Sequence, residues 1–368
     1  MRIELSKASK IIIKLGSSII DDQDEMIING ICASITKYLQ ENKEVILVTS
    51  GAISQGMKVM DVKNKPKDIK KLQSLAAVGQ QKLMLMYEKI FSEHDFQTAQ
   101  VLITHNDIND RVRYLNIKGT LEELLNNGVI PIINENDVVS TEEIKFGDND
   151  NLASMIANLV DADLLIILTD QKGMYDKNPD NYKDAKLINR IDIENLKDFD
   201  SDFSTQSEIG TGGFITKIQA AKRAALSNTY TVIANGLEKN ILNSIFTNNN
   251  AGTLFIPSEK KISAKKQWLD TTDSRGSIII DDGACKAIND NNSLLLVGVS
   301  AVEGYFEKGD VIQCMNSNHL CIAKGIVNYS SEDVMRAKGK TTDAIAEELG
   351  GEFSKELIHV DNLIVIET

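Results

Sequence analysis

Short apolar runs alternate with helix-length segments over the first 257 residues of the chain. Several of these runs are apolar on both faces, as expected of strands that are covered by helices on either side. The predicted strands are Ile11–Leu15, Glu44–Thr49, Thr98–Ile103, Val129–Ile133, Leu164–Thr169 and Thr231–Ala234. The predicted helices include Leu72–Ser92, Leu115–Asn127, Asn149–Leu159 and Thr216–Ser227. This alternation predicts right-handed crossovers and an α/β sandwich with a mainly parallel central sheet.

The pattern changes towards the C-terminus. A lysine-rich stretch, EKKISAKKQW, follows Pro257, and from Arg275 onward short strands are separated by glycine and aspartate turns such as DDG, KGD and LGG. One helix-like piece, Ser331–Ala337, interrupts them. We therefore predict an α/β domain over residues 1–257, a linker over 258–274, and a small, mostly β, barrel-like domain over 275–368.

Polar or glycine-rich segments follow four of the predicted strands. These segments are GSS after Leu15, SGA after Thr49, NEND after Ile133 and TDQKG after Leu168. In open α/β sheets the ligand lies beyond the carboxyl ends of the strands, so we expect the four segments to share one crevice.

Composition limits the classes of function. The 368 residues are 42% hydrophobic and 25% charged with a net charge of −13, which is typical of a globular protein and argues against general affinity for nucleic acid or anionic membranes. No signal peptide or membrane span is visible, so a cytoplasmic location is expected. The four cysteines form no CxxC pair and the four histidines no HExxH motif, so neither a disulfide framework nor a protein metal site is expected.

Two segments have the properties of a phosphate site. Residues 210–217 read GTGGFITK, in which glycines expose backbone amides, a helix start follows, and Lys217 supplies a cation. The alternative interpretation of residues 210–217 is a glycine turn followed by a threonine that caps the helix. Lys14 ends an apolar strand, where an ammonium group is costly without an anionic partner unless it reaches solvent. Two such lysines could clamp a phosphoryl group during transfer, a reaction that depends mostly on positioning and charge.

Residues 133–151, INENDVVSTEEIKFGDNDN, are dense in carboxylates and amides. Such a set at a strand end and a helix start suits a polar substrate that carries an amine, although single Asx residues also form ordinary turns and caps. The segment FGDNDN opens a helix. We therefore expect Asp148 and Asp150 to face the same crevice as the lysines.

Together these segments resemble the amino acid kinase family, and within it the glutamate 5-kinases that carry a C-terminal PUA domain. The matching segments are IKLGSS, VTSGAISQG, LAAVGQQKLM, VIPIINENDVV, IKFGDNDNLA, LIILTDQKGMY and GTGGFITKIQAA, over residues 11–225. Aspartokinases, carbamate kinases and uridylate kinases share the opening and the TD element but not the pair NEND and GDNDN. The tail resembles a PUA domain through GSIIIDDGACKAI, GYFEKGDVI and AKGIVNYSSED.

The resemblance implies a role for each matching residue. Lys14 and Lys217 would bind the ATP phosphates and stabilise the transferring γ-phosphoryl group, and Asp150 would hold Lys217 in place. The nucleotide would be lined by Lys14, Gly16, Ser17, Thr169, Asp170, Thr211, Gly212, Gly213, Phe214, Ile215, Thr216 and Lys217. The amino acid would be bound by Ser50, Gly51, Asn134, Asp137, Asp148 and Asn149. Mg²⁺ would be carried largely by the ATP phosphates.

The implied reaction is attack of the L-glutamate γ-carboxylate on ATP, the first step of proline biosynthesis, with proline as the expected feedback inhibitor. A carboxylate is already ionised at neutral pH, so no general base is needed. The resemblance also implies a homo-oligomer, either dimer or tetramer, and a glutamyl phosphate reductase that takes up the labile product.

Two alternatives remain open from the sequence. The first is a kinase of the same fold that acts on aspartate, N-acetylglutamate or a phosphate monoester. The second is an RNA-binding protein that acts through the C-terminal domain. From Arg275 onward, 8 lysines and arginines stand against 15 aspartates and glutamates, a net charge of −7, which disfavours RNA despite a local basic patch at Arg336, Lys338 and Lys340.

Overall fold

The chain forms two compact units, Met1–Ile262 and Ser263–Thr368. This division comes from a computed structural model, which describes a defined part of the sequence. The described residues are 3–20, 25–140, 149–177, 179, 182–196, 213–247, 251–258, 269, 272–338 and 356–366. The lysine-rich stretch 259–268 and the LGG segment lie outside them, so the predicted limits of the linker stay a prediction.

The first unit contains an eight-stranded sheet in the order β3-β4-β2-β1-β5-β7-β8-β6. The strands are β1 (Lys10–Leu15), β2 (Glu44–Thr49), β3 (Thr98–Ile103), β4 (Ile130–Glu135), β5 (Leu164–Thr169), β6 (Arg190–Asp192), β7 (Tyr230–Asn235) and β8 (Thr253–Ile256). All described pairs are parallel except β7 with β8. The six predicted strands and the mainly parallel sheet are confirmed.

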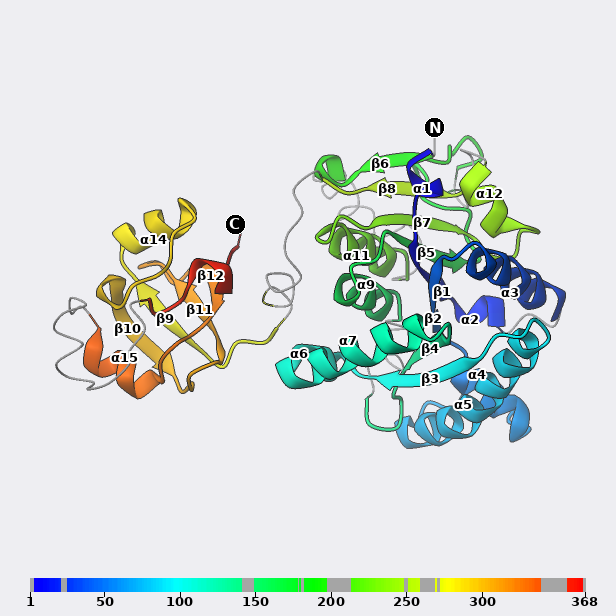
Figure 1. Cartoon of the computed structure of the whole chain (residues 1–368), viewed down its shortest axis with the longest axis horizontal. Coiled ribbons are helices and arrows are strands. Elements are labelled where there is room, and N and C mark those ends of the chain that lie inside the picture. Colours follow the sequence, from blue (N-terminus) through cyan, green and yellow to red (C-terminus); the bar gives the residue numbers. More distant parts are fainter. Residues whose placement is uncertain are drawn as a thin grey trace. The chain divides into compact units, whose positions relative to one another are not determined.

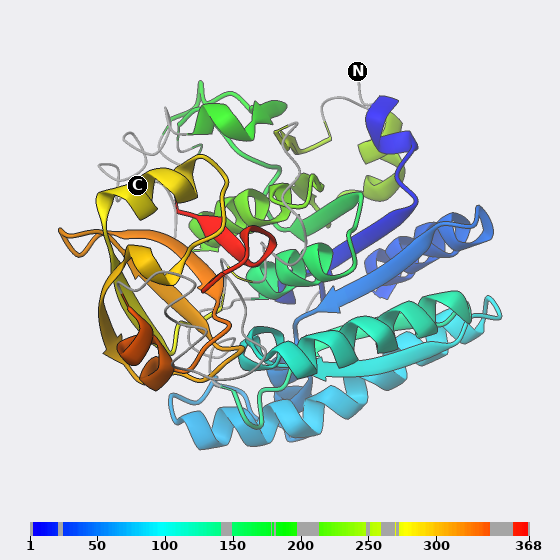
Figure 2. The same ribbon diagram turned by 60° about the vertical axis from the view of Figure 1, so that its left-hand side comes forward.

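Helices cover both faces of this sheet (Figure 1). They are α1 (Ile3–Ser6), α2 (Ser17–Ile20), α3 (Glu25–Gln40), α4 (Ala52–Val59), α5 (Ile69–Ser92), α6 (His105–Asn109), α7 (Arg111–Asn126), α9 (Asn149–Leu159), α11 (Gly213–Ala225) and α12 (Ile241–Thr247). Helices α3, α5 and α12 pack on one face, and α7, α9 and α11 contact strands from the other. Figure 2 shows α5 in light blue at the edge of the sheet, where it contacts β3. None of the described helices is long and apolar enough to span a bilayer.

Three predicted helices, α5, α7 and α11, start earlier in the structure, and a capping residue explains the first two. Helix α5 begins at Ile69 because the Asp68 carboxylate accepts a hydrogen bond from the Lys71 backbone amide at 2.9 Å. Helix α7 begins at Arg111 because the Asp110 carboxylate caps it in the same way. The apolar pattern alone could not locate these caps, because the residues that follow them are mostly polar.

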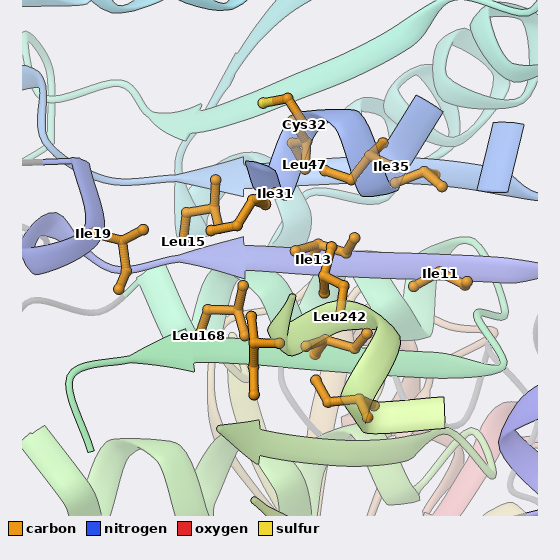
Figure 3. Packing of buried hydrophobic residues seen from close by; sticks show 14 of the residues in the cluster. Ile11, Ile13, Leu15, Ile19, Ile31, Cys32, Ile35, Leu47, Leu168 and Leu242 are labelled. Carbon is orange, nitrogen blue, oxygen red and sulfur yellow. The ribbon is translucent and has the colours of Figure 1, made fainter. Parts of the chain in front are cut away.

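Strand β1 divides its side chains between the two layers. Ile11, Ile13 and Leu15 lie in the large apolar cluster with residues of α3 and α12, as Figure 3 shows. The alternate positions, Ile12 and Lys14, face the layer that contains α9, which contacts β1. The sheet therefore aims Lys14 towards the first turn of α9.

Helices α4 and α5 cross at unusually short range. A Cβ added at Gly79 would lie 1.8 Å from the Ala52 carbonyl oxygen, and one at Gly56 would lie 1.9 Å from that of Leu75. Only glycine permits this approach of two helix backbones. Since Ala52 is the first residue of α4, the crossing fixes the start of that helix and the Ser50–Gly51 turn before it.

The second unit contains a five-stranded sheet in the order β10-β9-β11-β12-β13. Its strands are β9 (Gly276–Ile280), β10 (Val299–Gly304), β11 (Val311–Met315), β12 (Cys321–Ile326) and β13 (Leu363–Val365). The predicted helix is confirmed as α15 (Ser331–Ala337). The DDG segment, predicted to be a turn, instead starts a further helix, α14 (Asp282–Asn289), because Asp281 accepts a hydrogen bond from the Ala284 amide.

Candidate active site

Four adjacent parallel strands, β4, β2, β1 and β5, end at the same edge of the sheet. The backbone amide of Gly16 donates to the Leu168 carbonyl at 3.1 Å, and that of Ser50 donates to the Leu15 carbonyl at 3.1 Å. The polar segments that follow these strands are therefore side by side, as expected from their positions at the carboxyl ends of the strands.

Lys14, Asp150 and Lys217 form a buried ionic cluster at this edge. The Lys14 Nζ lies 2.7 Å from Asp150 Oδ1, and the Lys217 Nζ lies 2.9 Å from Asp150 Oδ2. Thr216 Oγ1 also donates to Asp150 Oδ2 at 3.2 Å. Lys14 is 5% exposed and Asp150 is 1% exposed, so Lys14 does not reach out to solvent.

Asp150 lies between the two ammonium groups of this cluster. Burial pushes the pKa of Asp150 upward, but the ammonium groups of Lys14 and Lys217 outweigh it and hold that pKa below its ordinary value. One carboxylate thus stands against two ammonium groups, and each ammonium group carries three N–H donors. Two ammonium groups held in a buried place by one carboxylate suit an incoming phosphate.

Asn149 connects β2, β4 and the start of α9. Its Nδ2 lies 3.0 Å from each of three acceptors, the Thr49 carbonyl, Ser50 Oγ and Asn134 Oδ1. Asn134 in turn donates from Nδ2 to Gln80 Oε1 at 2.8 Å and accepts from the Glu135 backbone amide at 2.9 Å. The oxygen and one N–H of the Asn134 amide are therefore engaged within the protein. In this structure Asn134 orients Asn149. The side chains of Ser50 and Asn149 lie together at the carboxyl ends of β2 and β4.

Asp137 follows β4 and is almost fully buried, at 5% exposure. Its Oδ1 has no hydrogen-bond partner among the described residues. Burial, and after it the negative charge of Glu135, raises the pKa of Asp137 to about 7, although Lys65 acts in the opposite direction. A carboxylate in such a setting gains most from a ligand that brings a positive charge.

The remaining nucleotide and amino acid residues named by the resemblance lie nearby or outside the described part. Gly16 and Ser17 lead from β1 into α2, and Thr169 ends β5 with its hydroxyl 3.0 Å from Asp170 Oδ1. Gly51 has φ 100°, a left-handed conformation that favours glycine. Ile215 is exposed in the first turn of α11, which starts at Gly213 and Phe214. Asp148, Thr211 and Gly212 lie outside the described residues.

Sequence reasoning missed two buried polar residues near Asp137. Gln80 lies on the buried side of α5, and Glu135 ends β4 with its Oε2 3.6 Å from His105 Nδ1. The signal for Gln80 was available, because it occupies the same helix face as the apolar Ala76 and Leu83. Within the described ranges, no group of three or more His, Cys, Asp or Glu is placed to hold a metal ion.

Comparisons with known proteins agree with this architecture. The sequence pattern of the amino acid kinase family matches residues 9–235, and that of the PUA domain matches residues 276–349. A glutamate 5-kinase from Thermoanaerobacter sp. (strain X514) is 45% identical, covering 97% of this chain and 98% of its own length. A glutamate 5-kinase from Marinomonas sp. (strain MWYL1) is 41% identical over the full length of both chains.

Among solved structures, N-acetylglutamate synthase from Neisseria gonorrhoeae, complexed with coenzyme A and N-acetyl-glutamate, superposes with a TM-score of 0.51. It is 13% identical and covers 70% of this chain and 62% of its own, so it supports the fold alone. The family patterns and the full-length relatives decide the assignment. The chain belongs to the amino acid kinase family, in its glutamate 5-kinase branch with a C-terminal PUA domain.

Proposed function

We propose that this protein phosphorylates the γ-carboxylate of L-glutamate with ATP, giving γ-glutamyl 5-phosphate and ADP, as the first step of proline biosynthesis. The observation that carries the proposal is the buried cluster of Lys14, Asp150 and Lys217, with Asn149 and Asp137 at the ends of neighbouring strands. The full-length similarity to glutamate 5-kinases supports the choice of substrate.

In this proposal the ionic cluster stabilises charge during transfer. Lys14 and Lys217 donate hydrogen bonds to phosphate oxygens of ATP and to the moving phosphoryl group. Asp150 holds both ammonium groups at fixed positions, 2.7 and 2.9 Å away. The attacking carboxylate is ionised at neutral pH, so the chain needs to orient it and not to deprotonate it.

Amino acid recognition falls to the segments after β2 and β4. Asp137 accepts hydrogen bonds from the substrate ammonium group, and its buried Oδ1, to which no described residue donates, supports that role. Ser50, Gly51 and Asn149, with Asp148, bind the rest of the glutamate. Asn134 holds Asn149 through its Oδ1, and the second N–H of its Nδ2 contributes to binding the glutamate.

Nucleotide binding falls to Gly16, Ser17, Thr169, Asp170 and residues 211–217. The cluster offers two lysines, which fit phosphate oxygens, and its carboxylate already contacts both of them, so Mg²⁺ enters bound to the ATP phosphates and neutralises their charge. We further propose inhibition by proline, a homo-oligomeric state, a cytoplasmic location and a reductase that consumes the acyl phosphate. Activity that stays flat under added proline would reject the first of these.

An acyl-phosphate trap tests the function. The protein is incubated with MgATP, hydroxylamine and L-glutamate, L-aspartate or N-acetyl-L-glutamate, and the hydroxamate is quantified. We expect product with glutamate, its loss in Lys217→Ala, and normal product in Lys37→Ala, an exposed position on α3. Product with aspartate or N-acetylglutamate, and none with glutamate, would overturn the assignment of glutamate as the substrate. No product with any acid would overturn the kinase activity.

A further inference from the structure

Helix α5 carries a buried amide with no role in the site described so far. Gln80 is 9% exposed and lies on the face of the helix that packs towards the sheet, with Ala76 and Leu83. A buried glutamine is costly unless the groups at the end of its side chain are hydrogen-bonded.

Only half of this amide is engaged by the described residues. The Gln80 Oε1 accepts a hydrogen bond from Asn134 Nδ2 at 2.8 Å, which settles which end is oxygen, because Asn134 Oδ1 is occupied by donors. The Gln80 Nε2 is buried and has no hydrogen-bond partner among the described residues. Its two N–H donors are thus in place for a ligand.

Gln80 and Asp137 line the same cavity, which has a volume of about 380 Å³. The Asp137 Oδ1 is also buried without a described hydrogen-bond partner. Apolar side chains, including Ala76, Met84 and Leu102, form much of the remaining wall. In the described part of the chain, one small cavity therefore combines an amide donor and a carboxylate oxygen that lack hydrogen-bond partners. An α-amino acid carries the matching carboxylate and ammonium on a single carbon atom.

We propose that Gln80 is a substrate-binding residue, whose Nε2 donates to the α-carboxylate of the amino acid while Asp137 accepts from its α-ammonium group. This inference rests on the proposed function and extends it. The two α-substituents are held together at one end, which leaves the γ-carboxylate free to point towards the phosphoryl group. Through its Oε1, Gln80 also holds Asn134, so that amino acid binding and the orientation of Asn149 depend on one side chain.

The variant Gln80→Glu separates the two functions of this residue. It keeps an oxygen that accepts from Asn134, but it replaces the N–H donor with a second acceptor. We expect KM for glutamate to rise about 10- to 100-fold, as for a lost hydrogen bond to a charged group, with KM for ATP unchanged. L-Isoglutamine keeps the γ-carboxylate but has an α-carboxamide that can donate. Its kcat/KM relative to that of glutamate should therefore rise at least about tenfold in Gln80→Glu.

Two further variants complete the experiment. Gln40→Glu adds the same charge at an exposed position at the end of α3, away from the residues that line this cavity, and should behave as wild type. Gln80→Met removes both polar groups and should also raise KM for glutamate.

Wild-type kinetics in Gln80→Glu, with a raised KM only in Gln80→Met, would show that Gln80 merely holds Asn134 and would overturn the proposal. Equal loss for glutamate and isoglutamine in Gln80→Glu, or unchanged kinetics in Gln80→Met, would overturn it as well. If wild type makes no hydroxamate from glutamate, the proposed function itself fails, and the substrate role of Gln80 fails with it.

Discussion

Replacing Asp137 by asparagine should stabilise the protein while it destroys glutamate binding. The pKa of Asp137 is raised from 3.8 to about 7 by burial and by Glu135. The folded protein therefore binds this proton more tightly than the unfolded chain, and its stability falls as the pH rises from about 4 to 7 and then stays level. At about 1.4 kcal/mol for each pH unit, the full loss is on the order of 4 kcal/mol.

Subtracting the stability of wild type from that of Asp137→Asn cancels the pH dependence that the two proteins share. Following this difference with pH then cancels the effects of the substitution that do not depend on pH. Between pH 5 and pH 8, the free energy of unfolding of Asp137→Asn minus that of wild type should increase by about 2.5 kcal/mol. Urea unfolding at pH 5, 6, 7, 8 and 9 measures this difference. Most of the increase should occur below pH 7, because the carboxyl group of the folded wild type is ionised above it.

A matched control uses an exposed aspartate. Asp95 has φ 63°, a conformation that asparagine adopts at least as readily, and Asp95→Asn should show no increase with pH. Stability curves for Asp137→Asn and wild type that run parallel from pH 5 to pH 9 would refute the reasoning. Glutamate should raise the unfolding midpoint of wild type and leave that of Asp137→Asn unchanged, because the ammonium group has lost its partner.

Three further predictions follow from contacts described above. Asp150→Asn leaves two buried ammonium groups beside a neutral amide, so kcat should fall roughly 100-fold or more in steady-state assays. Glu135→Gln removes a negative charge that raises the pKa of Asp137, so the acid limb of the pH profile of kcat/KM for glutamate should move to lower pH. Gly79→Ala should lower the free energy of unfolding by about 3 kcal/mol, whereas Gly119→Ala, in open space on α7, should raise it by about 0.5–1 kcal/mol.

Each of these has a result that would contradict it. Near-normal kcat in Asp150→Asn would mean that the two lysines need no anchor. An unmoved acid limb in Glu135→Gln would assign that limb to a group other than Asp137. Equal effects of the two Gly→Ala substitutions would show that the α4–α5 crossing tolerates a side chain.

The positions of six strands and the mainly parallel character of the sheet could be predicted from the sequence because most of these strands are apolar on both faces, whereas the order of the strands was not predicted. Strand β6 (Arg190–Asp192) escaped prediction because it has only three residues, two of them charged. Helix α14 escaped because its cap, Asp281, belongs to a DDG segment that is equally typical of a turn. Both predictions failed for the same reason. Whether a short segment forms a strand, a helix or a turn depends on its contacts with the rest of the fold and not on its own sequence pattern.

At the candidate site, the sequence indicated which residues gather but not how their polar atoms are paired. Lys14, Asp150 and Lys217 could be brought together from the strand and helix order, and the structure places them in contact. The engagement of Asn134 by Gln80 links positions 54 residues apart, and no periodicity reports such a bond. Whether an amide is available to a ligand depends on its partners, which only coordinates reveal.

The position of Lys14 on β1 has a consequence for folding accuracy. Because side chains alternate along a strand, a shift of β1 by one residue would carry Lys14 into the apolar layer occupied by Ile13 and Leu15, and would separate it from Asp150. Sheets whose strands are uniformly apolar lack a strong penalty against such a slip. In this protein Lys14, the proposed phosphate-binding residue, also makes a shifted register of β1 energetically unfavourable. A molecule with β1 out of alignment would thus be inactive and unstable for the same reason.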